Sequence, residues 1–394
     1  MPAALPVPDT EAAKHSALLT DAIRREIHAG GGWISFARYM ELALYAPGLG
    51  YYSAGSRKLG AAGDFITAPE LSPLFGRTVA RQVAEIMAAS SPQILELGAG
   101  SGKLAADMLA ELENLGSMPE QYSILEVSAD LRMRQQALFR ARLPHLRDRV
   151  RWLDALPEEF SGAVIANEVL DALPVHLVRW RDSAVTERGV ALAPGASNFI
   201  WEERAVSDPA LLQTASQISV PDDYASEICL AARGLVNSLA ERLVRGALLF
   251  IDYGFGAREF YHPQRRNGTL MCHYRHHAHD DPFFLPGLQD ITAHVNFTDI
   301  AASGIDAGLD LLGYTSQAHF LINCGITTLL EDQPADDPRE YLPLSAQLQK
   351  LTSPAEMGEL FKVIAMGKAC APTPEEGIPG RLCGFARGDM VRLL

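Results

Sequence analysis

The sequence predicts an α/β protein with a mostly parallel sheet and helices on both faces. Between Ile94 and Asp252, short apolar runs alternate with amphipathic helical patterns, as in a doubly wound sheet. The first apolar run, 93–95, leads directly into a glycine-rich turn at 96–102, and a helical pattern follows over 103–110. A short apolar run that ends in a glycine-rich turn and opens onto a helix is a nucleotide-binding corner.

The elements ahead of this corner are mostly helical. Glycines at 30–32 stop the first helical pattern, and a Pro-Gly turn follows the second. We expect a flexible tail at 1–13, helices at 16–28 and 35–44, a loop at 60–69 and an amphipathic helix at 74–88. Residues 14–90 would then form an N-terminal helical and lid segment.

The core of the sheet should lie in 91–175 and 225–394. The expected strands are 93–97, 122–126, 149–153, 163–167 and 247–252. After the fourth strand the alternation breaks, and 176–224 is predicted to be an inserted β-rich segment with antiparallel strands at 176–180 and 198–203 around a turn at 193–195. The remaining expected elements are a long helix at 221–245, an aperiodic lid at 253–296, a helix at 297–309, and antiparallel edge strands at 318–322 and 361–366.

Composition excludes several classes of function. The chain has 394 residues, of which 48% are hydrophobic and 21% charged, with a formal net charge of −14. An acidic chain is a poor ligand for nucleic acid and is better suited to a partner with an exposed basic side chain. Five scattered cysteines without a C-x-x-C pair indicate reduced thiols in a cytoplasmic protein. The sequence has no signal peptide and no apolar run of membrane-spanning length, so membrane insertion is not expected.

The spacing of the glycines indicates which nucleotide binds. A dinucleotide fingerprint read from Gly98 and Gly100 needs a third glycine or alanine at position 103, but Lys103 stands there and the third glycine is Gly102. Glu96 precedes the loop, where a carboxylate would repel a pyrophosphate and suit an ammonium and a sulfonium. This E-x-G-x-G-x-G pattern resembles motif I of the class I S-adenosylmethionine (SAM) methyltransferases, which have a Rossmann-like fold.

A second acid supports an adenosine-type ligand. Glu126 ends the second predicted strand, 24 residues beyond Gly102, and an acid at this place can accept both ribose hydroxyls. NAD and SAM enzymes share this device, so Glu126 alone does not choose between them. A nicotinamide dehydrogenase therefore remains a rival that Lys103 and Glu96 disfavour.

Four further segments are similar to one family in particular. They are 63–70 (GDFITAPE), 167–176 (NEVLDALPVH), 274–282 (YRHHAHDDP) and 289–297 (QDITAHVNF). In this order they resemble the MidA-like methyltransferases, which include mitochondrial factors that assist assembly of respiratory complex I. The resemblance covers the chain from about residue 15 onward and implies a SAM-dependent protein arginine methyltransferase fold with extra lid segments. Asn296 departs from the family, which leads us to expect an acid there.

The fourth predicted strand ends in the candidate catalytic residues. Because guanidinium is protonated at neutral pH, carboxylates must orient an arginine acceptor and stabilise charge while a base takes the released proton. We expect Glu168 to be that carboxylate, Asp171 its neighbour or a helix cap, and Asn167 a polar contact near the methionine end of SAM. His294 is a candidate base or part of the acceptor channel.

The other candidate cofactor-binding residues lie in loops. Asp64 is a candidate for holding the cofactor ammonium. The remaining cofactor candidates are Thr67, Pro69, Asp154 and Ala155. The cluster at 272–281 is rich in His and Asp, but without a second ligand group at familiar spacing we expect no metal.

Two further functions remain open from the sequence. The same cofactor site would serve methylation of a small molecule equally well, and a SAM-binding assembly or scaffold factor would need little turnover. The intact glycine loop, Glu96 and Glu126 argue against complete loss of the cofactor. The sequence does not identify the methyl acceptor, and it leaves a homodimer open.

Overall fold

The computed structural model describes residues 5–54, 67–196, 198–331, 338–370 and 381–394. The chain divides into two units, each with its own hydrophobic core. The first unit consists of Met1–Phe65, Asp171–Gly234 and Arg258–His294. The second unit consists of Ile66–Leu170, Leu235–Ala257 and Val295–Leu394.

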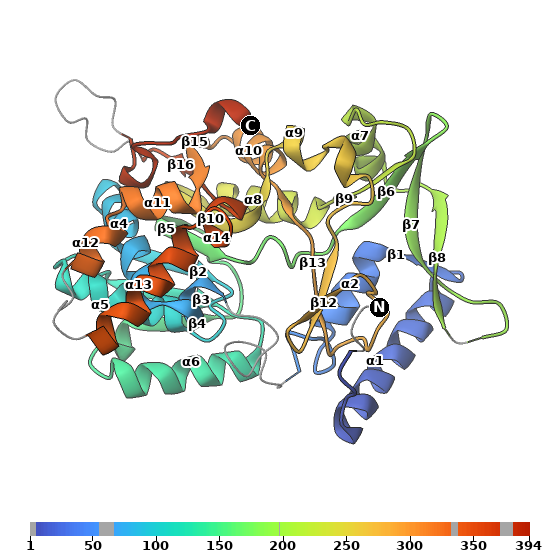
Figure 1. Ribbon diagram of the computed structural model, residues 1–394, viewed down its shortest axis with the longest axis horizontal. Coiled ribbons are helices and arrows are strands. Elements are labelled where there is room, and N and C mark those ends of the chain that lie inside the picture. Colours follow the sequence, from blue (N-terminus) through green and yellow to red (C-terminus); the bar gives the residue numbers. More distant parts are fainter. Residues whose placement is uncertain (1–4, 55–66, 197, 332–337, 371–380) are drawn as a thin grey trace. The chain divides into compact units, whose positions relative to one another are not determined.

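The second unit is built on an eight-stranded sheet, seven strands of which run in the order β15-β16-β10-β5-β2-β3-β4, with β14 paired to β10 (Figure 1). The five strands from β10 to β4 are all parallel, and β16 and β15 add an antiparallel edge. The strands are β2 Gln93–Leu97, β3 Gln121–Leu125, β4 Val150–Leu153, β5 Phe160–Asn167, β10 Leu243–Phe255, β14 Val295–Asn296, β15 Asp310–Ser316 and β16 Phe361–Lys368.

Both faces of this sheet are covered. Ala247, Leu249 and Ile251 of β10 join the core around α4 and α5, and Leu248 and Phe250 between them are also buried. Burial on both faces is typical of parallel strands flanked by helices and confirms the predicted α/β fold. The helices are α3 Ala68–Leu71, α4 Pro73–Ala89, α5 Lys103–Asn114, α6 Ala129–Arg142, α8 Leu230–Arg242 (which starts in the first unit), α10 Phe297–Asp306, α11 Gln317–Asn323, α12 Ile326–Glu331, α13 Pro338–Thr352 and α14 Met357–Leu360.

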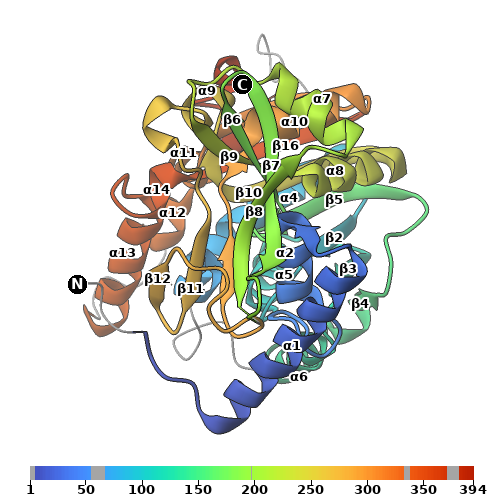
Figure 2. The same cartoon turned by 90° about the vertical axis from the view of Figure 1, so that its right-hand side faces the viewer.

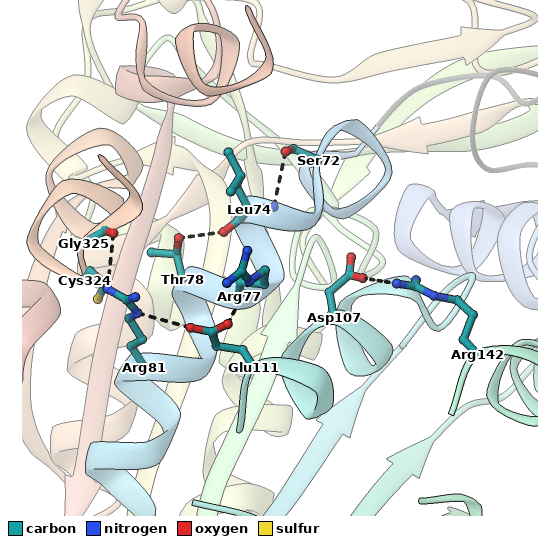
Figure 3. A network of polar contacts seen from close by, with 10 residues as sticks. All are labelled: Ser72, Leu74, Arg77, Thr78, Arg81, Asp107, Glu111, Arg142, Cys324 and Gly325. Atoms are coloured by element: carbon teal, nitrogen blue, oxygen red, sulfur yellow. Dashed lines mark hydrogen bonds and ion pairs between the residues drawn. The ribbon is translucent and has the colours of Figure 1, made fainter. Parts of the chain in front are cut away.

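A buried acid joins two helices of the second unit (Figure 3). Glu111 of α5, only 3% exposed, accepts a hydrogen bond of 2.8 Å from Arg77 Nε of α4 and pairs with Arg81 Nε at 3.6 Å. Arg81 also donates from Nη1 to the carbonyls of Cys324 and Gly325, at 3.4 and 3.3 Å, which ties α4 to the turn between α11 and α12. A buried carboxylate with paired guanidinium groups costs less to desolvate, so this network fixes how α4 and α5 pack.

The first unit contains two antiparallel sheets (Figure 2). The larger has the order β1-β7-β6-β9 with β8 paired to β7, and the smaller has the order β12-β11-β13. Tyr39 of α2 lies in its core, donates to the Pro282 carbonyl at 2.7 Å and stacks edge-on against Phe283. The elements are α1 Thr10–Ala29, β1 Trp33–Ser35, α2 Phe36–Tyr45, β6 His176–Arg181, β7 Ala184–Leu192, β8 Phe199–Ala205, α7 Pro209–Gln217, β9 Tyr224–Ile228, α9 Ala257–Phe260, β11 Met271–Tyr274, β12 His277–His279 and β13 Asp290–Thr292, with α9 starting at the last residue of the second unit.

All five predicted parallel strands are present, but several other expected elements differ. The run 318–322 is part of helix α11, and the edge partner of β16 is β15. The expected helix at 221–245 begins only at Leu230, because the alternating segment before it forms β9. Strand β7 was missed, and the turn predicted at 193–195 joins it to β8.

The boundaries of the N-terminal segments also shift. Helix α1 begins at Thr10, inside the tail expected at 1–13, because the Asp9 carboxylate accepts a hydrogen bond from the Ala12 amide at 2.9 Å and caps it. Residues 67–90, expected with the N-terminal segment, lie in the second unit. The region 253–296, expected to be aperiodic, contains β11, β12 and β13. Within the described residues, no helix is long and apolar enough to cross a membrane.

Candidate cofactor and acceptor site

The glycine-rich turn stands between β2 and α5 as predicted. Gly98, Gly100 and Gly102 all have positive φ, at 61°, 55° and 83°, which side-chain-bearing residues rarely adopt. A Cβ on Gly98 would come within 3.1 Å of the Val169 side chain, and one on Gly102 within 3.1 Å of the Gln135 side chain. The backbone conformation therefore favours glycine at all three positions, and the close side chains add to this preference at Gly98 and Gly102.

Three strand ends meet at this edge of the sheet. Leu97 is in register with Leu125 of β3 and with Ala166 of β5, so the residues that follow all three strands emerge together. Ligands of open α/β sheets bind at this carboxyl edge. We call residues 96–102 with Glu126 the cofactor corner, and residues 167–170 with Asp252 the acceptor corner.

Glu96 is a buried acid within β2. Its side chain is 2% exposed and accepts a hydrogen bond from the Tyr122 hydroxyl at 2.8 Å. Burial, with a smaller contribution from the nearby Glu126 carboxylate, raises the pKa of Glu96 to about 8 against the opposing effect of the Tyr122 hydrogen bond. This raised pKa favours the protonated, neutral form of Glu96 near pH 7.

Glu126 directly follows β3 and is held by several donors. Its Oε1 accepts from the Ser128 amide at 3.0 Å and its Oε2 from the Gln135 side-chain amide at 3.0 Å. Burial raises its pKa, and these hydrogen bonds oppose the rise because they stabilise the carboxylate. The structure thus places a fixed acceptor group at the end of the second strand of the motif.

The acceptor corner begins where β5 ends. The Asn167 side-chain amide donates to Glu168 Oε1 at 3.2 Å, whereas its Oδ1 is buried and has no partner in the described part of the chain. Glu168 has a φ of 52°, an unfavourable conformation for this residue, and its amide donates to the Ile251 carbonyl at 2.9 Å. Such backbone strain persists where the surroundings impose it, and it concentrates at functional sites.

The segment that precedes α4 is fastened to the glycine loop. Lys103 Nζ donates to the Pro69 carbonyl at 2.6 Å and pairs with Asp107 at 3.1 Å, and Ser101 Oγ hydrogen-bonds to Glu70. The Lys103 ammonium is therefore engaged by oxygen atoms of the protein. Thr67 is the N-cap residue of α3, and Pro69 is buried in that helix.

The remaining predicted cofactor residues, and Asn296, lie outside the cofactor and acceptor corners as defined above. Asp154, after β4, is 90% exposed and pairs with Arg132 at 2.8 Å, and Ala155 follows it. Asn296, at the position where the family resemblance leads us to expect an acid, caps α10 by accepting a hydrogen bond from the Asp299 amide at 3.4 Å. Asp64 lies outside the described residues.

Asp171 and His294 belong to the first unit, whereas Glu168 belongs to the second. Asp171 is buried, and its carbonyl accepts from the Ala293 amide at 3.0 Å. The His294 amide donates to Thr269 Oγ1 at 3.0 Å, and burial, with a smaller effect of Arg265, lowers the pKa of its imidazole to about 4. The catalytic roles of these two residues therefore remain predictions.

Comparison with known proteins decides the family. The model of the family described as "Putative S-adenosyl-L-methionine-dependent methyltransferase" matches residues 76–315. The chain belongs to this family. The mitochondrial protein arginine methyltransferase NDUFAF7 is 31% identical in Danio rerio, over 85% of this chain and 83% of the relative, and 32% identical in Mus musculus, over 85% and 81%. A crystal structure from Burkholderia thailandensis with bound S-adenosyl-homocysteine (SAH) is 49% identical, covers 99% of this chain and 100% of its own, and superposes with a TM-score of 0.94.

The cofactor of this methyltransferase is SAM, and the residues of the cofactor corner fit it. They offer carboxylates and glycine backbone, and the ammonium of Lys103, which begins the helix after the loop, is paired within the protein. At the same edge, the buried Asn167 Oδ1 accepts no hydrogen bond from the residues that the structure describes. This set of groups suits a ligand that carries hydroxyls, an ammonium and a sulfonium better than a pyrophosphate.

Two residues at this site were missed from the sequence. Gln135 of α6 donates to the Gly100 carbonyl at 2.8 Å as well as to Glu126, and Asp252 of β10 accepts from the Leu170 amide at 2.9 Å. Asp252 was recognised only as the last residue of a strand, although it holds the turn that follows Glu168. Neither residue belongs to a local motif, so only the fold could reveal its contact.

Proposed function

We propose that this methyltransferase modifies arginine side chains of proteins. The observation that carries the proposal is Glu168, an acid held with positive φ at the end of β5, beside the cofactor corner. The relatives named above are protein arginine methyltransferases, which supports the same acceptor. The net charge of −14 also suits a polypeptide with exposed basic side chains.

Glu168 meets the main requirement of an arginine acceptor. When bound, SAM supplies a methyl group carried on a positively charged sulfur. The carboxylate of Glu168 accepts hydrogen bonds from the guanidinium, fixes its plane and stabilises the positive charge that grows on it. Holding the acceptor nitrogen in contact and in line contributes most of the acceleration in such a displacement. The Asn167 amide contacts Glu168 and restricts the carboxylate's rotation.

The released proton needs an acceptor. His294 is a candidate for this role from the sequence, and its imidazole, with a pKa lowered to about 4, is neutral at pH 7. Asp171 is the other candidate that the sequence offers as a base or as a neighbour of the acceptor.

We also propose a cytoplasmic location. All five cysteines are free thiols, which is consistent with it.

Labelled SAM tests the acceptor directly. The purified protein is incubated with methyl-tritiated SAM and a hypomethylated protein extract. Labelled gel bands are then hydrolysed, and the resulting amino acids are separated. We expect label to co-migrate with methylarginine, and we expect Glu168→Gln to remove it. Label in methyllysine or in a small-molecule fraction would instead overturn the arginine assignment and leave the methyltransferase family intact.

A further inference from the structure

A single amide connects the two halves of the cofactor corner. Gln135 of α6 is completely buried, and its Nε2 donates both to the Gly100 carbonyl, at 2.8 Å, and to Glu126 Oε2, at 3.0 Å. Its Oε1 accepts from the Trp152 indole at 2.8 Å. A buried amide with all of these groups bonded is strongly held, because any rotation would leave polar groups without partners.

The indole fixes which way the amide points. Trp152 Nε1 is only a donor, so the oxygen of Gln135 must face it and the NH₂ group must face the two acceptors. Trp152 is itself positioned on β4 and contacts Phe139 of α6 edge-on, with ring centroids 6.0 Å apart. The orientation of the amide therefore follows from the packing of α6 on β4.

The amide in turn restricts both parts of the site. Glu126 is held through one oxygen by Gln135 and through the other by the Ser128 amide, so its carboxylate plane is fixed before any ligand arrives. The Gly100 carbonyl is fixed by the same NH₂ group, and Gly102 lies against the Gln135 side chain. Pre-organised acceptors bind more tightly because they lose less freedom on binding.

We propose that Gln135 is a positioning residue that sets affinity for the ribose of the cofactor by holding Glu126 and the glycine loop in one arrangement. The proposal rests on the predicted contact between Glu126 and the ribose hydroxyls. It is independent of the methyl acceptor, so it can be tested by ligand binding alone.

The test compares two ligands, SAH and its 2′,3′-dideoxy analogue, by calorimetry. Gln135→Met keeps the length of the side chain and removes the hydrogen bonds. We expect it to weaken SAH binding about tenfold and to change binding of the dideoxy analogue less than twofold. Gln136→Met is the matched control on the same helix, and it should change neither.

A second variant guards against a folding defect. Trp152→Phe keeps the aromatic packing and removes the indole donor, so it should weaken SAH binding in the same selective way but to a smaller extent. Equal losses for both ligands would mean that Gln135 only supports the fold, and an unchanged SAH affinity in Gln135→Met would also overturn the proposal. Glu126→Ala tests the assumed contact with the ribose separately from the role of Gln135. Unchanged SAH binding in that variant would refute the ribose contact itself.

Discussion

The cofactor corner and the acceptor corner lie at the same edge of one sheet, yet their polar groups are satisfied differently. At the cofactor corner, both oxygens of Glu126 already have donors, and the glycines adopt conformations that suit them. At the acceptor corner, Glu168 is a non-glycine residue at a φ of 52°, and Asn167 Oδ1 is buried without a partner in the described residues.

Under the proposed function, this difference separates cofactor binding from the methyl-transfer step. At the cofactor corner, hydrogen bonds hold Glu126 in one orientation, which pre-organises the acceptor, although burial raises the pKa of both Glu96 and Glu126. At the acceptor corner, Glu168 has a positive φ and Asn167 Oδ1 lacks a partner among the described residues, which fits the proposal that a substrate binds there. Changes in the first corner should therefore alter affinity, and changes in the second should alter turnover.

Glu168→Gln should have the largest effect. The amide keeps the shape of the side chain and removes the charge that stabilises the guanidinium, so we expect turnover to fall by roughly two orders of magnitude or more. SAH affinity should stay unchanged because the lost contact belongs to the acceptor. Initial rates with labelled SAM and calorimetry with SAH measure the two quantities.

Glu168→Gly separates strain from chemistry at the same position. Glycine readily adopts a φ of 52°, so the variant should unfold at the same or a higher denaturant concentration than the parent while turnover is lost. A Glu168→Gln enzyme with normal turnover would contradict the acceptor role and remove the contrast between the two corners.

Glu126→Ala should be the strongest disruption of the cofactor corner. Loss of a charged, largely buried contact with two hydroxyls costs about 2–3 kcal/mol, or roughly a hundredfold in SAH affinity by calorimetry. Asp148→Ala removes an acid that is 90% exposed and paired with its neighbour Arg147, so it serves as the charge-matched control and should bind normally. A loss of less than threefold in Glu126→Ala would place the ribose elsewhere.

The contrast also explains what the sequence could predict. The glycine loop and Glu126 stand directly after apolar runs, and Glu168 is separated from one by Asn167 alone, so strand ends and turn residues could be read from neighbouring positions. Gln135 contacts a carbonyl 35 residues away, and Asp252 accepts from an amide 82 residues away. The packing of α6 and β10 determines such contacts, and no local sequence pattern predicts that packing.

The same limit explains the misassigned elements. The run at 318–322 is apolar enough for a strand, but as helix α11 it buries Phe320 and Leu321 and exposes Ile322 by 51%. Periodicity over five residues cannot separate these outcomes. Strand β7 was missed because its charged positions Glu187 and Arg188 interrupt the alternation, and Glu187 is buried through a hydrogen bond with His176 at 2.7 Å.

Glu96 should make the unliganded protein less stable as pH rises. Its folded pKa of about 8 lies above its unfolded value, so between roughly pH 4.5 and 8 the folded chain binds the extra proton and stability falls with increasing pH. One such group contributes a slope of up to about 1.4 kcal/mol per pH unit. Denaturant unfolding from pH 5 to 9 should show a flatter profile for Glu96→Gln than for the parent, and parallel profiles would contradict the assignment.

The smallest effect should come from the contact that fastens residues 67–71 to the glycine loop. Lys103→Met keeps the aliphatic stem but loses the hydrogen bond to the Pro69 carbonyl, and Asp107 keeps its bond from Arg142 at 2.8 Å. Loss of about 1 kcal/mol should weaken SAH binding roughly fivefold, because Thr67 and Pro69 are no longer held beside the loop. Lys103→Arg retains a cationic donor and should recover most of the affinity in the same calorimetric titration. If Lys103→Met binds SAH normally, the cofactor corner is organised by Glu126 and its donors alone, and the lysine serves only to join α3 to α5.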